Sequence, residues 1–486
     1  MTERDLAQKK AAESGSNEDW KKFKLLRNQI NGILKKEKSV WQASRMENCA
    51  TTSDIWKTVK NWLGWKTGGP PTQLVVNGEL LNKPKELSKS MNEYFVNKVT
   101  NLRGSIPPCR KNPLERVRNL MQNRRCSFSL KAVHPDDISK IIQNLKSSKS
   151  CGLDNIDSFV LKLACEELTP AITHVVNLSI GQSYFPSTWK TSKVIPLFKK
   201  GDSTVQKNYR PVSLLPITSK ILEKVVYEQL VKYLEENCIL HPSHHGFRKN
   251  HSTATALLEM YSSWVEAFEE NKVTAVVMLD MSAAFDLVDK EILIEKLKLY
   301  GLDDNSSSWM ESYMSCRSQQ VFLDGELSDT LPVDVGVLQG SILGPILYCL
   351  MVNDFSEVAH NHPPDGEDFP SLWNTYCSNC GGISCFADDS SFSKSSKDPQ
   401  LLNQEIKEKY SEISDYMASN GLVLNSEKTH LLVMASKTQH RLYGNYRVEL
   451  DTGLEMILPE NHERLLGCEI RSNFTWNEHI KVLTYA

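Results

Sequence analysis

Apolar residues recur at helical spacing in several segments after residue 131, and short apolar runs lie between these segments. Ile138, Ile141, Ile142 and Leu145 fall on one face of a segment that begins His134-Pro-Asp-Asp, and acidic residues in a first turn favour a helix. Further helices are expected at residues 219–236, 252–269 and 290–300, and strands at 194–198, 274–279, 321–323 and 383–386. Few strands between long helices predict an α+β fold with helices packed on a sheet.

A separate segment with helical spacing precedes this region. Phe23, Leu26, Ile30 and Leu34 are spaced as one helical face within residues 20–66. The following Lys66-Thr-Gly-Gly-Pro-Pro-Thr contains residues that end helices. The pattern therefore predicts a helical N-terminal extension closed by a turn or linker.

The net charge is close to zero, but the charge is unevenly distributed. The 57 Lys and Arg against 59 Asp and Glu give −2 over 486 residues, which argues against a simple cationic nucleic-acid coat protein. Three stretches are nevertheless basic, with +8 in residues 20–66, +7 in 103–131 and +5 in 186–210, so the remainder carries −22. Such stretches are either solvated surface or contacts for nucleic-acid phosphates.

The sequence carries no mark of export or of a membrane. The start, Met1-Thr-Glu-Arg-Asp-Leu, has no apolar signal-peptide core, and no stretch reaches about 18 uninterrupted apolar residues. The 12 cysteines are sparse and irregularly spaced, unlike a disulfide framework. An intracellular protein, nuclear or cytoplasmic, with free thiols is expected.

Carboxylates in two places are the candidate chemistry. Asp280 ends an apolar run, where burying an unpaired charge would be costly. Asp388 and Asp389 stand between two strand-like runs, as at a hairpin tip, where a cation would relieve their repulsion. An ordinary polar turn at Asp388 and helix N-caps at Asp286 or Asp289 are the alternatives. Together, the carboxylates could hold two metal ions for in-line phosphoryl transfer.

Ordered blocks over residues 185–480 resemble the reverse transcriptases of non-LTR retrotransposons of the jockey-like lineages. The blocks are Phe185-Pro-Ser-Thr-Trp-Lys, Asn208-Tyr-Arg-Pro-Val-Ser, His245-Gly-Phe-Arg, the segment from Asp280 to Asp286, Gly336-Val-Leu-Gln-Gly-Ser, Phe386-Ala-Asp-Asp and Gly421-Leu-Val-Leu-Asn-Ser-Glu-Lys. The resemblance implies an RNA-directed DNA polymerase with right-hand palm and fingers and a small antiparallel catalytic sheet. Its partners would be an RNA template, a DNA or RNA primer and deoxynucleoside triphosphates.

The resemblance also implies the roles of individual residues. Asp280, Asp388 and Asp389 would be the catalytic carboxylates and bind two Mg²⁺ ions, which Mn²⁺ could replace. Adjacent strand residues face opposite sides, so Asp388 is favoured as the stronger ligand of the pair. Lys199 or Lys200, with Arg210, would grip the triphosphate of the incoming nucleotide.

Further positions would shape the nucleotide pocket and the template path. Phe285 would exclude a ribose 2′-OH, unless it is a packed core residue. Gln339 and Gly340 would lie beneath the template–nucleotide pair, and Lys428 would donate a proton to pyrophosphate, unless it is simply exposed. The expected template contacts are Gly246, Phe247 and Arg248, and His241, His244, His245 and His251 would contact template or cap the helix at Ser252.

By the same resemblance the chain divides into a basic, mostly helical connector (1–130), a helical lead-in (131–176) and fingers and palm (177–475), with the thumb largely absent. Residues 356–382, which contain Cys377 and Cys380, are expected to form an extended loop. A zinc site needs about four N or S ligands, so a surface insertion is favoured. Without an upstream endonuclease motif or a thumb, a catalytically inactive remnant that only binds nucleic acid stays open as the alternative.

Overall fold

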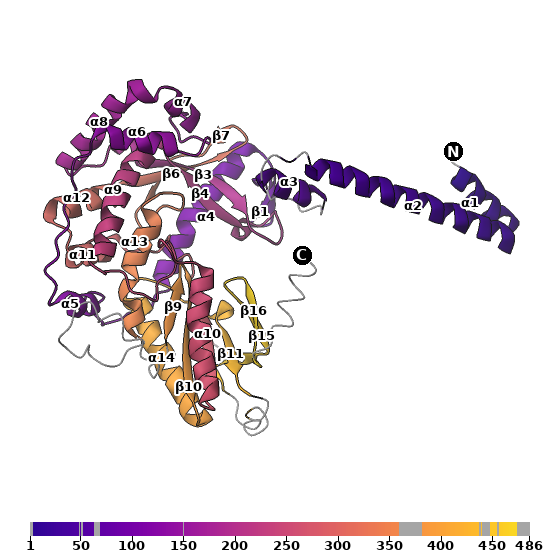
Figure 1. Ribbon diagram of the computed structural model, residues 1–486. Helices are drawn as coiled ribbons and strands as arrows, with labels where there is room; N and C mark the ends of the chain where they lie inside the picture. Colours follow the sequence, from indigo (N-terminus) through magenta and orange to yellow (C-terminus); the bar gives the residue numbers. More distant parts are fainter. Residues whose placement is uncertain are drawn as a thin grey trace. The chain divides into compact units, whose positions relative to one another are not determined.

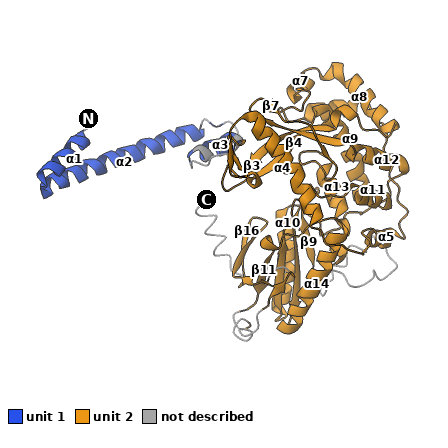
Figure 2. Ribbon diagram, turned by 180° about the vertical axis from the view of Figure 1, so that it is seen from behind, with its two compact units in different colours: residues 1–69 blue, residues 70–486 orange. Residues whose placement is uncertain are grey.

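Figure 1 shows the computed structural model, in which helices and strands are mixed as the sequence predicts. It describes residues 3–47, 49, 52–62, 69–148, 150–358, 382–436, 439, 448–453 and 456–473. The chain forms two compact units, residues 1–69 and residues 70–486, which are coloured separately in Figure 2. The division at residues 130 and 176 stays a prediction.

The predicted helices are confirmed near their expected bounds. The helices are α1 (Glu3–Ser14), α2 (Asn17–Glu47), α3 (Thr52–Trp62), α4 (Pro84–Gly104), α5 (Glu115–Met121), α6 (Pro135–Asn144), α7 (Ser158–Leu163), α8 (Cys165–Gly181), α9 (Ile217–Glu236), α10 (Thr253–Glu269), α11 (Lys290–Leu299), α12 (Asp304–Met314), α13 (Gly344–Met351) and α14 (Pro399–Ser419). Within these described helices, none is both long and apolar enough to cross a bilayer.

The N-terminal unit contains a long helix, as predicted, but its apolar face is only partly covered. Phe23 is buried on α2, whereas Leu34 is 60% exposed. Helix α1 packs on α2 within this unit. The helical spacing therefore identified the helix correctly but did not identify a core.

One sheet of five strands carries the run that ends in Asp280. Its order is β14 (Pro459–Glu460), β11 (His430–Met434), β5 (Val273–Leu279), β10 (Asp389–Ser396) and β9 (Ile383–Phe386). The central strand β5 is antiparallel to both β10 and β11. We refer to this sheet as the carboxylate sheet.

Strand β5 is buried along its whole length because helices cover both faces of the carboxylate sheet. Val277 and its alternate neighbours face the main core, which includes Leu402 and Ile406 of α14. Met278 faces the other side, where Trp264 of α10 packs. Alternation of side chains along a strand explains how one apolar run serves two cores.

A second sheet is present that the sequence interpretation did not separate from the first. It contains β4 (Tyr209–Leu214), β3 (Thr191–Phe198), β6 (Arg317–Leu323) and β7 (Glu326–Leu327), with β8 (Leu331–Val333) paired to β6. Helix α4 packs against β6 around a small core that includes Phe95 and Val321. The four predicted strands are thus real, but they are divided between two sheets.

The remaining short strands form separate ribbons. They are β1 (Leu74–Val76) with β2 (Glu79–Leu81), β12 (Leu450–Asp451) with β13 (Met456–Ile457), and β15 (His462–Leu465) with β16 (Cys468–Arg471).

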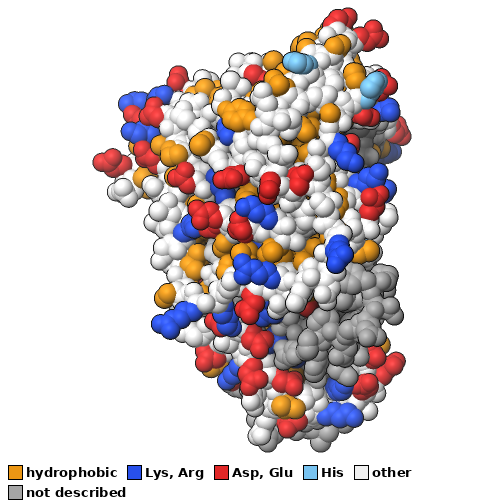
Figure 3. Space-filling view, turned by 90° about the vertical axis from the view of Figure 1, so that its left-hand side faces the viewer, with side chains coloured by type: hydrophobic (Ala, Val, Ile, Leu, Met, Phe, Trp, Pro, Cys, Tyr) orange, Lys and Arg blue, Asp and Glu red, His pale blue; other side chains and the backbone are white. Residues whose placement is uncertain are grey.

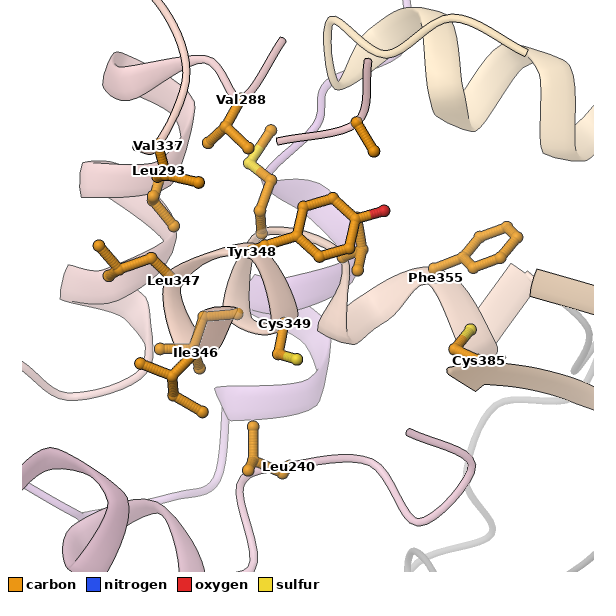
Figure 4. Packing of buried hydrophobic residues seen from close by; sticks show 14 of the residues in the cluster. Leu240, Val288, Leu293, Val337, Ile346, Leu347, Tyr348, Cys349, Phe355 and Cys385 are labelled. Carbon is orange, nitrogen blue, oxygen red and sulfur yellow. The ribbon is translucent and has the colours of Figure 1, made fainter. Parts of the chain in front are cut away.

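Helix α13 lies at the centre of the main core. Its Tyr348, Leu347 and Ile346 pack among side chains from distant parts of the chain, including Val288 and Leu240 (Figure 4). Burial raises the pKa of the Tyr348 hydroxyl well above its usual range, and the nearby charge of Asp388 adds to this. The same core includes Cys385 of β9 and Phe392 of β10, so it lies directly beneath the β9–β10 hairpin. We refer to this hairpin, which carries Asp388 and Asp389, as the carboxylate hairpin.

Candidate active site

Asp280 emerges from the end of β5 and is held by the segment that precedes β11. The Asn425 backbone N–H donates to the Asp280 carbonyl oxygen at 2.9 Å. Asn425 Nδ2 and Lys428 Nζ donate to Asp280 Oδ2, at 3.3 and 2.8 Å. Asp280 caps no helix, whereas Asp289 does cap α11, accepting from the backbone N–H groups of Glu291 and Ile292. The helix-cap alternative is thus settled for Asp289.

Asp388 and Asp389 lie at the tip of the β9–β10 hairpin. The register pairs Ser390 with Leu279, so one step further along the antiparallel ladder Asp389 stands opposite Asp280. Asp388 lies in the two-residue turn, next to Ala387, whose φ is 59°. Because Asp388 is in a turn, the alternation argument that favoured it over Asp389 does not apply, and the relative strength of the two ligands stays a prediction.

The three carboxylates influence one another electrostatically. Although the Asp389 side chain is exposed, partial desolvation by the surrounding protein raises its pKa, and the charges of Asp388 and Asp280 raise it further. A cation would relieve this repulsion. The structure therefore brings together the three residues that the sequence singled out.

A basic hairpin faces this group. Lys199, Lys200 and Arg210 are exposed at the end of the β3–β4 hairpin. Desolvation lowers the pKa of Lys199, and the nearby charges of Arg210, Lys428 and Lys200 lower it further. The charge of Asp280 acts in the opposite direction. Cations from two distant segments thus lie near one carboxylate, as a triphosphate site requires.

Phe285 is half-buried and lies between two other rings. It stacks on Tyr348 with ring centroids 4.7 Å apart and meets Phe247 edge-on at 6.1 Å. The ring is thus fixed by core packing while part of its surface remains accessible. Both sequence interpretations of Phe285 describe part of its environment.

Gln339 and Gly340 lie against β4. The Gln339 carbonyl oxygen accepts from the Ser213 backbone N–H at 2.8 Å. Gly340 has a φ of 120°, and a Cβ there would come within 2.4 Å of the Ser213 carbonyl oxygen. The close backbone approach is therefore to a neighbouring strand, and only glycine allows it.

The residues expected to contact template differ in their surroundings. Phe247 is 44% exposed. Gly246 is buried against the hairpin tip, where a Cβ would lie 2.3 Å from the Ala387 backbone nitrogen. Arg248 Nη1 donates to the carbonyl oxygens of His241 and His244 at 2.8 and 3.3 Å, and burial lowers the pKa of this guanidinium. The loop that contains Gly246 and Arg248 therefore packs against the tip of the carboxylate hairpin and supports it.

The histidines of the same loop are mostly structural. His241, His244 and His245 are buried, and burial lowers the pKa of His244 to about 3. His245 bonds Thr255 and Glu259, at 3.1 and 2.7 Å, so it anchors α10. The N-cap of α10 is Ser252, in a capping box with Thr255. The expectation that these three histidines touch template is not favoured by their burial.

Sequence reasoning missed a buried carboxylate that shapes the loop after Gly340. Glu223 of α9 accepts from the backbone N–H groups of Ile342 and Leu343, at 2.7 and 3.4 Å, and from the Tyr313 hydroxyl at 3.2 Å. Glu223 is fully buried. Its one signal in the sequence is its place between Ile221-Leu222 and Val225-Val226, which the neighbouring Lys224 weakens.

The carboxylate donors fit a hard divalent cation, although no complete site is formed. Among the described residues, no group of three or more His, Cys, Asp or Glu side chains is arranged to hold a metal ion. Exposed Asp388 and Asp389 leave space for water and phosphate oxygens, which complete typical Mg²⁺ sites. Cys377 and Cys380 lie outside the described residues, and none of the ten described cysteines forms a disulfide.

Comparison with known proteins agrees with this chemistry. Residues 198–484 match the family described as reverse transcriptase (RNA-dependent DNA polymerase). The chain is 26% identical over 313 residues to the RNA-directed DNA polymerase from mobile element jockey of Drosophila melanogaster, covering 64% of this chain and 33% of that protein. It is 24% identical over 371 residues to the probable RNA-directed DNA polymerase from transposon BS of the same organism, covering 72% and 40%.

The chain thus spans between a third and two-fifths of the length of these two relatives. The resemblance to non-LTR retrotransposon reverse transcriptases is confirmed. Since the family match extends over more than half of its residues, the chain belongs to the reverse transcriptase (RNA-dependent DNA polymerase) family.

Proposed function

We propose that this chain catalyses RNA-directed DNA synthesis, adding deoxynucleotides to a primer 3′ end on an RNA template. The observation that carries the proposal is the grouping of Asp280, Asp388 and Asp389 at one edge of the carboxylate sheet, close to the cations Lys199 and Lys428. Negative and positive groups in this arrangement suit a triphosphate and its metal ions.

In this proposal residues 177–475 form fingers and palm. The carboxylate sheet with α10 and α14 is the palm, and the β3–β4–β6 sheet is the fingers. Support comes from the burial of β5, which leaves Asp280 at a rigid strand end, and from the basic hairpin that belongs to the other sheet. Catalytic groups on rigid elements keep their geometry better than groups on loops.

Two Mg²⁺ ions, or Mn²⁺ in their place, would be held by Asp280, Asp388 and Asp389. When bound, such ions neutralise the charge that develops on the phosphates and on the primer oxygen. Lys199 and Arg210 would bind phosphate oxygens, where the guanidinium fork suits two oxygens at once. Lys428 Nζ lies 2.8 Å from Asp280 Oδ2, and Lys428 would donate the proton that pyrophosphate accepts.

Phe285 and Phe247 would face the nucleotide and template. Phe285 is fixed by stacking on Tyr348, so it could reject a ribose 2′-OH without a change of rotamer. Phe247 presents an exposed ring of the kind on which bases stack. Gly246 and Arg248 would contribute to template binding indirectly, because they hold the loop that carries Phe247.

A primer-extension assay on poly(rA) with oligo(dT) tests the proposal. Wild type should incorporate dTTP in the presence of Mg²⁺, and Asp388→Asn should lose at least about a hundredfold in rate, since it removes a group that acts on the transition state. Asp324→Asn, an exposed acid with a φ of 43° in the β6–β7 turn, is the matched control. Equal incorporation by wild type and Asp388→Asn would instead support a remnant that only binds nucleic acid.

A further inference from the structure

Asp286 makes a side-chain contact that neither helix capping nor the carboxylate group explains. Its Oδ1 accepts a hydrogen bond from Gln339 Nε2 at 2.8 Å. The two residues are 53 positions apart, and the contact joins the segment that follows Asp280 to the loop that precedes α13. The contact therefore links two parts of the proposed nucleotide pocket.

The backbone around Gln339 is already fixed by other contacts. The Val337 N–H donates to the Phe285 carbonyl oxygen at 2.8 Å, and the Gly336 N–H donates to that of Val288 at 2.9 Å. A Cβ at Gly336 would come within 2.6 Å of the Asp286 carbonyl oxygen, so the two segments are in close backbone contact. The Asp286 side chain therefore affects the orientation of the Gln339 side chain and not the path of the backbone.

Asp286 is held in a place that is costly for a carboxylate. Burial raises its pKa, while the charge of Lys98 and the hydrogen bond from Gln339 lower it. It borders a cavity of about 110 Å³ that is also lined by Phe95 and Val99 of α4. Asp286 is only partly exposed to solvent, and a carboxylate with little access to water needs a hydrogen-bond donor, so the Gln339 contact stabilises it.

The carboxylate allows only one orientation of the Gln339 carboxamide. The amide nitrogen can donate to Asp286, but the flipped group would set its oxygen against the carboxylate oxygen, acceptor against acceptor. With the nitrogen fixed on Asp286, the carbonyl oxygen Oε1 is directed away from it.

We propose that Asp286 is a positioning residue for nucleotide binding, which fixes the Gln339 carboxamide so that one defined face of it meets the incoming nucleotide beside Phe285. This inference rests on the proposed function, because it assigns a task to the same nucleotide pocket. Asp286 itself touches no reacting atom. Its effect passes entirely through Gln339.

Steady-state kinetics with a single deoxynucleotide test the assignment. Asp286→Leu, similar in size but without an acceptor, should raise KM for the nucleotide about tenfold and leave kcat within about twofold. Asp286→Asn keeps an acceptor at Oδ1 and should raise KM less than Asp286→Leu. The split between KM and kcat is the readout that a general loss of structure would not produce.

A double-variant cycle separates action through Gln339 from any other action. Gln339→Leu alone should raise KM, and adding Asp286→Leu should raise it no further, because the contact is already gone. Asp334→Leu is the matched control, since Asp334 borders the same cavity and should leave KM unchanged. Thermal melts of each variant identify any that has lost its fold, and Asp286→Asn, which keeps the shape of the side chain, then provides the comparison.

The outcomes are distinguishable from failure of the proposed function. If wild type extends no primer, the polymerase proposal fails and this inference fails with it. If wild type is active but the Asp286 and Gln339 effects on KM multiply independently, or Asp286→Leu changes kcat alone, the polymerase proposal stands and the positioning role is overturned.

Discussion

Three carboxylates at one sheet edge make Asp389 a residue at which function and stability oppose each other. Its pKa is raised by desolvation and by the charges of Asp388 and Asp280. A carboxyl group whose pKa is higher in the folded chain binds its proton more tightly there than in the unfolded chain. The folded state therefore loses stability as the pH rises from the ordinary aspartate value through the raised one.

Removing this charge should stabilise the fold in the absence of metal. Asp389→Asn is expected to melt at a higher temperature than wild type at pH 7.5 in EDTA, and the difference should shrink as the pH falls below the raised pKa and wild type becomes protonated. Differential scanning fluorimetry at several pH values measures both. Primer extension by the same variant should be lost.

Mg²⁺ provides the complementary measurement. Because a cation relieves repulsion among the carboxylates, adding Mg²⁺ should raise the melting temperature of wild type more than that of Asp389→Asn. Asp324→Asn removes an exposed charge elsewhere and should behave as wild type. An Asp389→Asn variant that melts lower than wild type in EDTA would count against the repulsion.

Phe285 is the second residue whose substitution has a defined outcome. Phe285→Val leaves more space beside the nucleotide sugar, so ribonucleotide incorporation relative to deoxynucleotide incorporation should rise by roughly tenfold or more. Competition assays with rNTP and dNTP measure the ratio of the two kcat/KM values.

Phe285→Tyr is the control for Phe285→Val, because it keeps the ring that stacks on Tyr348. It should retain wild-type selectivity. Loss of the stacked ring in Phe285→Val also lowers stability, so selectivity is compared only between folded variants at the same temperature. An unchanged ratio in Phe285→Val would remove Phe285 from the selection of the sugar.

At the scale of elements, the tip of the β9–β10 hairpin depends on the loop behind it. The His245 N–H donates to the Cys385 carbonyl oxygen at 2.8 Å, and the Cys385 N–H donates to that of Ser243 at 2.9 Å. The loop thus runs beside β9 as an additional partner. Gly246 follows directly and lies against Ala387.

Gly246→Ala should therefore displace the hairpin that carries Asp388. Its Cβ would lie 2.3 Å from a backbone nitrogen, a contact that no side-chain movement relieves. We expect primer extension to fall at least about tenfold and the melting temperature to fall, as overpacking typically costs about 1–3 kcal/mol.

A glycine in open space is the matched control. Gly104 ends α4, and a Cβ there would meet nothing within 4 Å. Gly104→Ala should keep wild-type activity and stability or gain slightly in stability, since alanine favours helices. If the two alanine variants behaved alike, the loop could not be the support of the hairpin.

The sequence predicted elements well because their signals are local. Apolar spacing located α6, α9, α10 and α11, and β-branched runs located β3, β5, β6 and β9. The assignment of β3 and β6 to a second sheet was not predicted, because sheet partners are chosen by tertiary contacts. For the same reason the contacts of Glu223 and the Asp286–Gln339 contact could not be predicted, since each joins segments far apart in the chain.

The order of motifs along the chain identified the candidate site residues, whereas their contacts and burial could be described only from the structure. Asp280, Asp388 and Asp389 were brought together as expected. The template contact of Arg248 stays a prediction, and the structure adds that its guanidinium donates to two carbonyl oxygens of its own loop. A motif fixes which residue is present and leaves open whether its side chain points outward or inward.

For the whole molecule, the distribution of charge has more meaning than its total of −2. On the described part of the face in Figure 3, acidic and basic side chains are interspersed. The basic stretches at residues 20–66, 103–131 and 186–210 differ from this average. Clustered cations near nucleic acid release counterions on binding, so their contribution is visible in the salt dependence of affinity.

Lys35, Lys36 and Lys38 of α2 offer a direct test of the N-terminal basic stretch. All three are exposed on the helix. In the full chain, their joint replacement by Gln should weaken RNA binding and reduce the slope of log K against log salt concentration by up to about two units, at about 0.7 per lost phosphate contact. Fluorescence anisotropy of a labelled RNA at several KCl concentrations gives the slope.

Three lysines already paired with acids provide the control at the same change of charge. Lys224, Lys232 and Lys298 form exposed ion pairs with Glu228, Glu236 and Glu295. Their joint replacement by Gln should leave the slope unchanged, although it alters the net charge equally. If both triple variants reduced the slope alike, net charge would govern binding. If neither did, the N-terminal stretch would be solvated surface, and phosphate contacts would belong to the other basic stretches.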